Sequence, residues 1–261
     1  MRNIFEINEP TCISFSGGRT SAYMLWRYIN DNNGLPDNAY ICFSNTGKEQ
    51  EETLKFVNDC ALHWDVEINW LEFDDSESKF KIVDFESASR NGEPFEKLIK
   101  KRKYLPNPVA RFCTGELKIL TIERYFKFLG IPDFETAVGI RADESRRAAK
   151  MKDKLTPLIH ANVTQKTVQD FWKANSFDLG LNFNNGITPL GNCDLCFLKG
   201  GSQIVSLIAD KPERAIWWAK MESDIGGTWR SDRPDYASMG KFTASQADMF
   251  SDESISCFCG D

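Results

Sequence analysis

The string CISFSGGRTSAYML near the amino terminus constrains the fold of this chain more than any other segment. A short apolar run over residues 11–16 stops at Gly17-Gly18, and apolar residues then recur with helical spacing over residues 22–29. The pattern predicts a strand, a glycine turn and a helix in direct succession. Such a turn suits phosphate, because glycine permits positive φ and the first amides of the helix can bind an anion. Taken alone, however, a Gly-Gly turn is more often structural.

The same alternation of strand and helix continues through the first 150 residues. Residues 39–43, 66–73 and 134–140 have the apolar patterns of strands, and residues 49–63 carry apolar side chains on one helical face. Strands that alternate with helices form parallel sheets covered on both faces. We therefore predict an α/β fold with a parallel twisted sheet flanked by helices, of Rossmann-like type.

The final third of the chain has a different pattern. Residues 164–175, 203–209 and 213–223 read as helices with no convincing strand between them. Residues 226–261 are rich in Gly, Ser and Asp, and we expect an irregular tail there. We predict a nucleotide-binding α/β domain over residues 1–160 and a helical carboxyl-terminal region over 161–261.

Eight cysteines against two histidines limit both the compartment and the metal chemistry. The start of the chain lacks the pattern of a signal peptide, and no run approaches the roughly 18 apolar residues of a membrane helix. We therefore expect a cytoplasmic protein with no membrane partner, whose cysteines are reduced. Any metal site must use sulfur or carboxylate ligands. The net charge of −6 disfavours a general polyanion-coating protein but allows a local basic patch.

Four motifs in order resemble those of the PP-loop ATP pyrophosphatases, also called adenine nucleotide alpha hydrolases. The superfamily's loop has the form SGGxxS, which matches Ser16 to Ser21 here. Three more segments, FSNTGKEQEETLKFV, RFCTGELKI and GIRADESRR, are similar to the branch that contains phosphoadenosine phosphosulfate reductase. With the CxxC at Cys193, the resemblance covers residues 11 to 200.

The resemblance implies a nucleotide site at the carboxyl ends of the strands. Ser16, Gly17, Gly18, Thr20 and Ser21 would hold the phosphates of ATP or a related adenine nucleotide, with charge added by Arg19. Asn45 and Thr46 would line the nucleotide pocket, and Mg²⁺ would assist at the phosphates. Arg111, Lys118 and Arg141 would neutralise phosphate or sulfate, with Lys118 and Arg141 in catalytic roles. The alternative is that these cations are solvated or paired with Glu116, Asp143 or Glu144.

Cysteines 193 and 196 form a CxxC flanked by glycines, a turn that can direct two thiolates at one metal. By itself it could equally be a redox pair or half of a zinc site. In the iron-sulfur members of the similar branch, a cysteine pair precedes the CxxC by about 80 residues, and Cys113 lies 80 residues before Cys193. The resemblance thus implies a [4Fe-4S] cluster on Cys113, Cys193 and Cys196, completed by Cys257 or Cys259, with Zn²⁺ as the alternative. Cys12, Cys42 and Cys60 lie in apolar patterns and are expected in the core.

Three functions remain open at this point. The first is ATP-dependent sulfur transfer to a nucleic acid or nucleoside, with a sulfur donor protein as partner. RNA or DNA would meet the basic segment 97–111, although such a run is often a solvated helix face. The second is a thioredoxin-linked reductase of adenylyl sulfate, in which Cys259 would be the attacking thiolate, but the Glu and His of the reductases' terminal motif are missing. The third is a regulator without turnover. A homodimer is among the predicted assemblies.

Overall fold

The computed structural model describes residues 3–151, 153–183 and 188–251. The chain divides into two units, Met1–Leu98 with Phe112–Cys193 and Ile99–Arg111 with Asp194–Asp261. The predicted boundary at residue 160, based on the change from alternating strands and helices to helices alone, stays a prediction.

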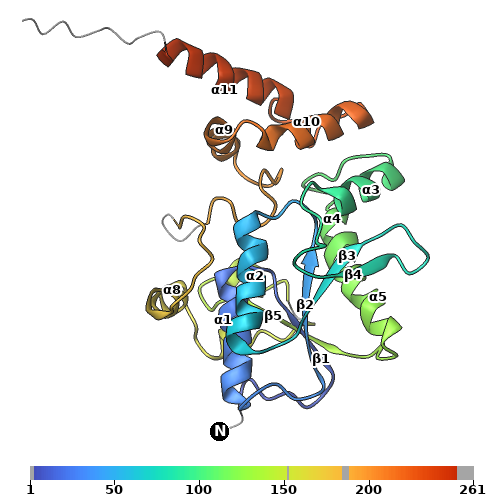
Figure 1. The fold of residues 1–261 in the computed structure, drawn as a ribbon, viewed down its shortest axis with the longest axis vertical. Helices are drawn as coiled ribbons and strands as arrows, with labels where there is room; N and C mark the ends of the chain where they lie inside the picture. The colour runs from blue at the N-terminus through green and yellow to red at the C-terminus, as the bar shows by residue number, and fades with distance from the viewer. Residues whose placement is uncertain (1–2, 152, 184–187, 252–261) are drawn as a thin grey trace, which may run out of the picture. The chain divides into compact units, whose positions relative to one another are not determined.

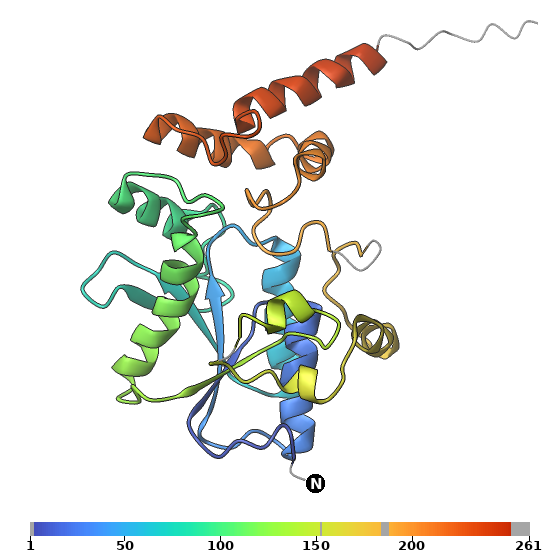
Figure 2. The same cartoon turned by 180° about the vertical axis from the view of Figure 1, so that it is seen from behind.

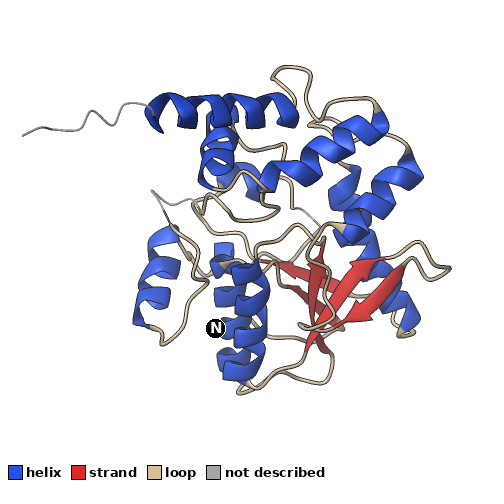
Figure 3. Cartoon of the chain, turned by 45° about the horizontal axis from the view of Figure 1, so that its top comes forward, coloured by secondary structure: helices blue, strands red, loops and turns tan. Residues whose placement is uncertain are grey.

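The first unit contains one five-stranded sheet in the order β4-β3-β2-β1-β5 (Figures 1 and 3). β1 pairs in parallel with β2 and β5, and β2 pairs in parallel with β3. The prediction of an α/β fold is therefore confirmed, with one difference: the short edge strand β4 runs antiparallel to β3. The strands are β1 (Thr11–Ser14), β2 (Ala39–Asn45), β3 (Ile68–Phe73), β4 (Phe80–Val83) and β5 (Glu135–Val138).

Successive side chains of the strands enter two separate cores. Ile41 and Phe43 of β2 belong to the core on one face, whereas Cys42 between them belongs to the core on the other. Cys12, Cys42 and Cys60 are fully buried, as predicted. Because both faces are covered, the only positions left for ligands on such a sheet are its edges and the ends of its strands.

Helices cover both faces of this sheet. α1 (Arg19–Asp31) and α2 (Glu51–Trp64) lie along one face, and α5 (Leu120–Phe128) lies along the other (Figures 1 and 2). α8 (Gln165–Ala174) packs on α1 through Phe171, whose ring contacts Tyr23 and Trp26. The remaining helices of this part are α3 (Glu93–Arg102), which continues into the second unit, α4 (Phe112–Thr114), η1 (Gly115–Ile119), α6 (Ser145–Ala148) and α7 (Pro157–His160).

The helices of the second unit are α9 (Gly201–Asp210), α10 (Arg214–Ile225) and α11 (Tyr236–Ser251). The prediction of an irregular tail from residue 226 is therefore wrong for α11. The Gly, Ser and Asp residues that suggested a tail lie largely on either side of α11, whereas Tyr236, Met239 and Thr243 within it are buried at helical spacing. Tertiary packing of this face stabilises the helix. Across the described ranges, no helix combines the length and apolarity that crossing a membrane requires.

Candidate functional site

The glycine loop joins β1 to α1 at the carboxyl edge of the sheet. Gly17 has φ +73°, and a Cβ there would lie 2.6 Å from Cγ2 of Thr53. Ser21 closes the loop: its hydroxyl donates to the Gly18 carbonyl oxygen (2.9 Å) and accepts from the Ser16 amide (3.1 Å). The Ser16 hydroxyl therefore donates to Ser21 Oγ at 2.9 Å. The loop is held open by its own hydrogen bonds, and the first amides of α1 carry no side-chain cap.

Arg141 reaches this loop from the end of β5, the neighbouring strand. Its Nη1 donates to Thr20 Oγ1 at 3.2 Å, and its Nε donates to Asp143 Oδ1 at 2.9 Å. The close approach requires Gly139, where a Cβ would lie 2.9 Å from the Ser21 Cα. The guanidinium is thus fixed beside the loop, where it can neutralise an anion.

A cavity of about 420 Å³ adjoins the loop within the first unit. That volume falls in the range of small-molecule sites. Asn45 and Thr46 are not among its lining residues. It is lined by residues 16–21, Thr53, Gly139, Arg141, Glu144, Arg147, Gln165, Val168, Gln169, Leu179, Phe183, Thr188, Gly191 and Asn192.

The Arg19 side chain lines this cavity and bonds to the segment after α8. Its Nε donates to Asp178 Oδ1 at 2.6 Å and its Nη2 donates to the Leu181 carbonyl oxygen at 3.0 Å. Trp172 Nε1 in turn donates to the Arg19 carbonyl oxygen at 2.9 Å. Arg19 thus ties the loop to α8 and to the segment after it, and its role in phosphate binding stays a prediction.

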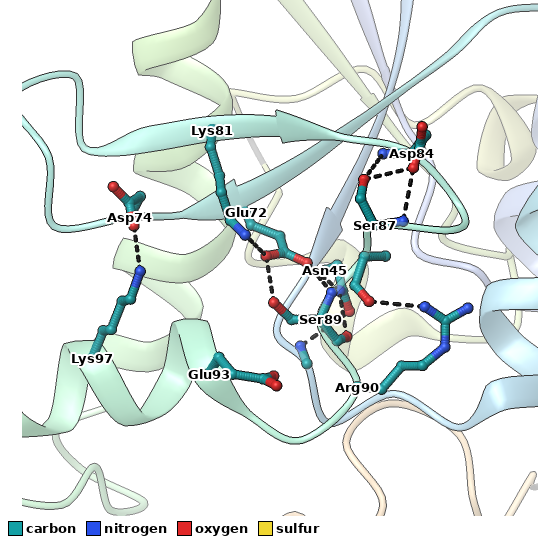
Figure 4. A network of polar contacts seen from close by, with 12 residues as sticks. Asn45, Glu72, Asp74, Lys81, Asp84, Ser87, Ser89, Arg90, Glu93 and Lys97 are labelled. Carbon is teal, nitrogen blue, oxygen red and sulfur yellow. Dashed lines mark hydrogen bonds and ion pairs between the residues drawn. The ribbon is translucent and has the colours of Figure 1, made fainter.

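A buried polar network fixes the end of β2 (Figure 4). The Asn45 amide donates to Glu72 Oε1 at 2.6 Å and to the Ser89 carbonyl oxygen at 2.8 Å, while Asn45 Oδ1 accepts from the Gly47 amide at 3.0 Å. Glu72 is fully buried and also accepts from the amide and hydroxyl of Ser89 and from Lys81 Nζ. Every polar atom of the Asn45 side chain is therefore engaged in shaping the turn that follows β2.

That turn presents a carboxylate to an ammonium group. Glu49 Oε2 accepts from the amide of Thr46 at 2.9 Å and from its hydroxyl at 2.7 Å. Glu49 Oε1 has no hydrogen-bond partner within the described ranges, and it lies 3.6 Å from Lys118 Nζ. The Glu49 side chain is 2% exposed, so its charge is oriented by the turn and compensated by Lys118.

Two predicted metal ligands lie around Lys118. Burial acts to lower the pKa of the Lys118 ammonium, but the negative charges of Glu49, Cys193 and Cys113 outweigh it and raise the pKa above its ordinary value. Cys193 Sγ lies 3.5 Å from Thr46 Oγ1. Cys113 precedes the π-helical turn η1, which carries Lys118. π-turns inside α-helices are frequent at functional sites.

The described residues do not by themselves form a metal centre. Within the parts of the chain that the structure describes, no group of three or more His, Cys, Asp or Glu side chains is placed to hold a metal ion. Cys196 belongs to the second unit, as does the exposed Arg111. Cys257 and Cys259 lie outside the described residues. The ligand set of the predicted cluster therefore stays a prediction.

The CxxC turn is held by the second unit's own aromatic residues. Asp194 Oδ1 accepts from Trp218 Nε1 at 2.8 Å and from the Leu195 amide at 2.7 Å. The Tyr236 hydroxyl donates to the Leu195 carbonyl oxygen at 2.6 Å. The two residues between the cysteines are buried, so the turn is rigidly positioned rather than a loose surface loop.

Sequence reasoning missed Glu49 and Glu72 as parts of the site. Both are acidic residues near the end of a strand, a position that is usually solvated. The signal that could have found Glu72 is its place inside the apolar strand β3, where an ionised side chain must be paired.

Fold and site together define an α/β protein with a glycine-loop pocket at the carboxyl edge of a mostly parallel sheet. The chain belongs to the family of ORF290, the nin region protein of Escherichia phage lambda that is described as uncharacterized. The two are 31% identical over 202 residues, which cover 74% of this chain and 67% of the phage protein.

Two further comparisons are weaker. MJ0066 of Methanocaldococcus jannaschii is 28% identical over 153 residues, which cover 58% of this chain but 27% of that protein. The U34-tRNA thiolase NcsA of Methanococcus maripaludis, solved with its [4Fe-4S] cluster, aligns over 100% of this chain and 79% of its own with 14% identity. The TM-score of this structural alignment is 0.42. No family model matches the chain.

Proposed function

We propose that this chain is a PP-loop adenine-nucleotide enzyme that transfers sulfur to a nucleic acid or nucleoside. The observation that supports this most is the order of two neighbouring strands. The glycine loop follows β1, and the turn that holds Thr46 beside Cys193 follows β2. An anion-binding loop and a cysteine with an adjacent ammonium group therefore lie at one edge of one sheet.

The proposed reaction has two displacements. An oxygen of the acceptor base attacks the α-phosphorus of ATP, a new P–O bond forms, and the bond to the bridging oxygen breaks as pyrophosphate leaves. A hydrosulfide-level sulfur then attacks the activated carbon, the C–S bond forms, and AMP leaves with the oxygen. Sulfide keeps its oxidation state throughout, so no oxidant or reductant is consumed.

The chain's own residues would serve both displacements. The loop amides and Arg141 would bind and neutralise the phosphates, with Mg²⁺ sharing that charge. Lys118, held by Glu49, would hold a sulfur anion near Cys113 and Cys193 by charge attraction. A [4Fe-4S] cluster, or Zn²⁺ as the alternative, on Cys113, Cys193, Cys196 and Cys257 would supply a metal that binds sulfur.

The proposed nucleic-acid contact is the segment 97–111. It carries six basic and no acidic side chains. Lys100, Lys101, Arg102, Lys103 and Arg111 are all exposed. Contacts of this type neutralise phosphates and release counterions, so binding should weaken steeply with salt.

Reduction of adenylyl sulfate is the second candidate, supported by the Arg-x-Cys-Thr and Gly-x-Arg segments. Both place a cation, Lys118 or Arg141, where it can face a sulfonucleotide. Its attacking thiolate would be Cys259, outside the described residues. The third candidate, a regulator without turnover, predicts binding of a nucleotide without product.

Release of labelled pyrophosphate from γ-labelled ATP tests the proposal. The anaerobically purified chain should release pyrophosphate and AMP faster when RNA or DNA and sulfide are present, and Gly18→Asp should abolish this by crowding and charge repulsion. Sulfite formed from an adenylyl sulfate without pyrophosphate release would instead establish the reductase. Absence of iron, acid-labile sulfide and zinc in the same preparation would remove the metal centre from the proposal.

A further inference from the structure

The cavity beside the glycine loop is lined by more than the loop itself. Its far wall, as we call it, is formed by α8, through Gln165, Val168 and Gln169, and by the segment that carries Leu179 and Phe183. None of these residues belongs to the motifs that predicted the phosphate site. This part of the cavity could therefore contact a part of the ligand other than its phosphates.

The far wall is preorganised by contacts to the loop itself. Thr164 caps α8 with a capping box, and the backbone N–H of Gln165 donates to Asp143 Oδ2 at 3.0 Å. Asp143 also accepts from Arg141, so the start of α8 is linked to the cation beside the loop. Trp172, farther along α8, donates to the Arg19 backbone. The distance from loop to wall is thus set by the fold before any ligand binds.

The far wall combines two side-chain amides, of Gln165 and Gln169, with apolar side chains. Val168 and Leu179 are 4% and 3% exposed, whereas the Phe183 ring is 36% exposed. Gln165 and Gln169 are half-buried and one helical turn apart, so their side chains share one face of α8. Neither glutamine amide group forms a side-chain hydrogen bond with any residue in the described part of the chain. The Asn45 side chain was predicted to line the nucleotide pocket. By contrast, its amide is fully hydrogen-bonded to Glu72, Ser89 and Gly47.

We propose that Gln165 and Gln169 form a recognition site for the 6-aminopurine ring of the nucleotide whose phosphates bind the glycine loop. An amide pairs with adenine by donating to N7 and accepting from the N6 amino group. Guanine offers two acceptors, N7 and O6, at the same edge, so one amide cannot make both bonds. Val168, Leu179 and Phe183 supply apolar contact for the ring faces. This inference rests on the nucleotide site of the proposed function and not on sulfur transfer.

Calorimetric titration of the full chain with ATP, GTP and pyrophosphate tests the site. The wild-type chain should bind ATP more tightly than GTP. Gln165→Ala and Gln169→Ala should each lower the ATP-over-GTP preference by about tenfold, as expected for the loss of a base contact. Pyrophosphate affinity should be unchanged in both variants, because it binds at the loop. Lys173→Ala, exposed on the same helix and absent from the cavity lining, is the matched control and should retain the wild-type preference.

Gln169→Glu separates recognition from folding, because it keeps the size of the side chain but removes the donor to N7. It should lose the preference for ATP with an unchanged circular dichroism spectrum. If all three glutamine variants keep the wild-type preference while pyrophosphate still binds, the base site is overturned and the phosphate site stands. If the wild-type chain binds neither ATP nor pyrophosphate, the proposed function is overturned together with this inference.

Discussion

Lys118 and Glu49 form an ion pair with 3.6 Å between Nζ and Oε1, although 69 positions of sequence separate them. The carboxylate is 2% exposed and its second oxygen is saturated by the turn after β2. The pair thus links the end of β2 to the π-turn beside Cys113.

Removing either partner should destabilise the protein, because it leaves the other charge poorly compensated. We expect Glu49→Gln and Lys118→Met each to cost about 2 kcal/mol in the free energy of unfolding, with a coupling energy above about 1 kcal/mol in the double-mutant cycle. Urea unfolding of the wild type, the two single variants and the double variant gives the four free energies of unfolding. The exposed pair Lys166–Asp170 on α8 serves as the control and should show coupling below about 0.5 kcal/mol. Equal coupling in the two cycles would contradict a special role for Glu49.

Gly17→Ala should destabilise the glycine loop by about 3 kcal/mol, since the new Cβ combines positive φ with overlap at Thr53. Gly34→Ala separates these two causes. Gly34 has φ +112° but nothing within 4 Å of a Cβ, so only strain remains and about 1 kcal/mol is expected. Thermal unfolding of both variants gives the comparison, and similar losses would show that the contact with Thr53 is unimportant.

The Asp74–Lys97 pair in Figure 4 should make stability depend on acid pH. The hydrogen bond from Lys97, at 2.6 Å, lowers the pKa of Asp74 to about 2. A depressed carboxyl pKa stabilises the fold above the unfolded value of about 3.9, and this stabilisation is lost as pH falls toward 2. Because Lys97 is half-exposed, Asp74→Asn should cost only about 1 kcal/mol at pH 7 and almost nothing near pH 2. Lys97→Met should show the same pH dependence in urea unfolding, and a pH-independent loss in either variant would refute the assignment.

Trp218→Phe should loosen the CxxC turn without unfolding the second unit. The substitution keeps an aromatic ring but removes the donor to the buried Asp194. Leaving that acceptor short of one bond should cost about 1–3 kcal/mol. Amide hydrogen exchange at Leu195, whose N–H also bonds to Asp194, should accelerate about tenfold or more. Ile216→Ala, 67% exposed on the same helix, should leave this exchange unchanged.

The sequence predicted the elements whose pattern is local and strong. The run from Thr11 and the helix after Gly18 both form where expected, because a fully buried strand and an amphipathic helix leave periodic signals. β4 and α11 were missed for opposite reasons. β4 has four residues, too few for a pattern, whereas α11 is flanked by Gly, Ser and Asp residues that indicated a tail, and its buried face begins at Tyr236.

Side-chain partners were much harder to predict than elements. Arg19 follows Gly17-Gly18 directly and was therefore predicted to bind phosphate. Its guanidinium, however, bonds to Asp178, which lies 159 residues farther along the chain. Asn45 was predicted to line the nucleotide pocket because it lies at the carboxyl end of a strand, and its amide is occupied by Glu72 and Ser89. Contacts of this kind depend on which distant segments pack together, and no local pattern encodes them.

The π-turn at Gly115–Ile119 makes the place of Cys113 depend on chain length. A π-turn holds one residue more than an α-helical turn, so loss of a single residue there would restore a regular helix. Everything ahead of it, including Cys113, would then rotate by about 100° around the axis relative to Lys118. The number of residues between Cys113 and Lys118 therefore determines whether the two side chains lie on the same side of the helix. Among relatives, conservation of that interval would distinguish chains that retain the thiol beside the ammonium from chains that keep only the fold.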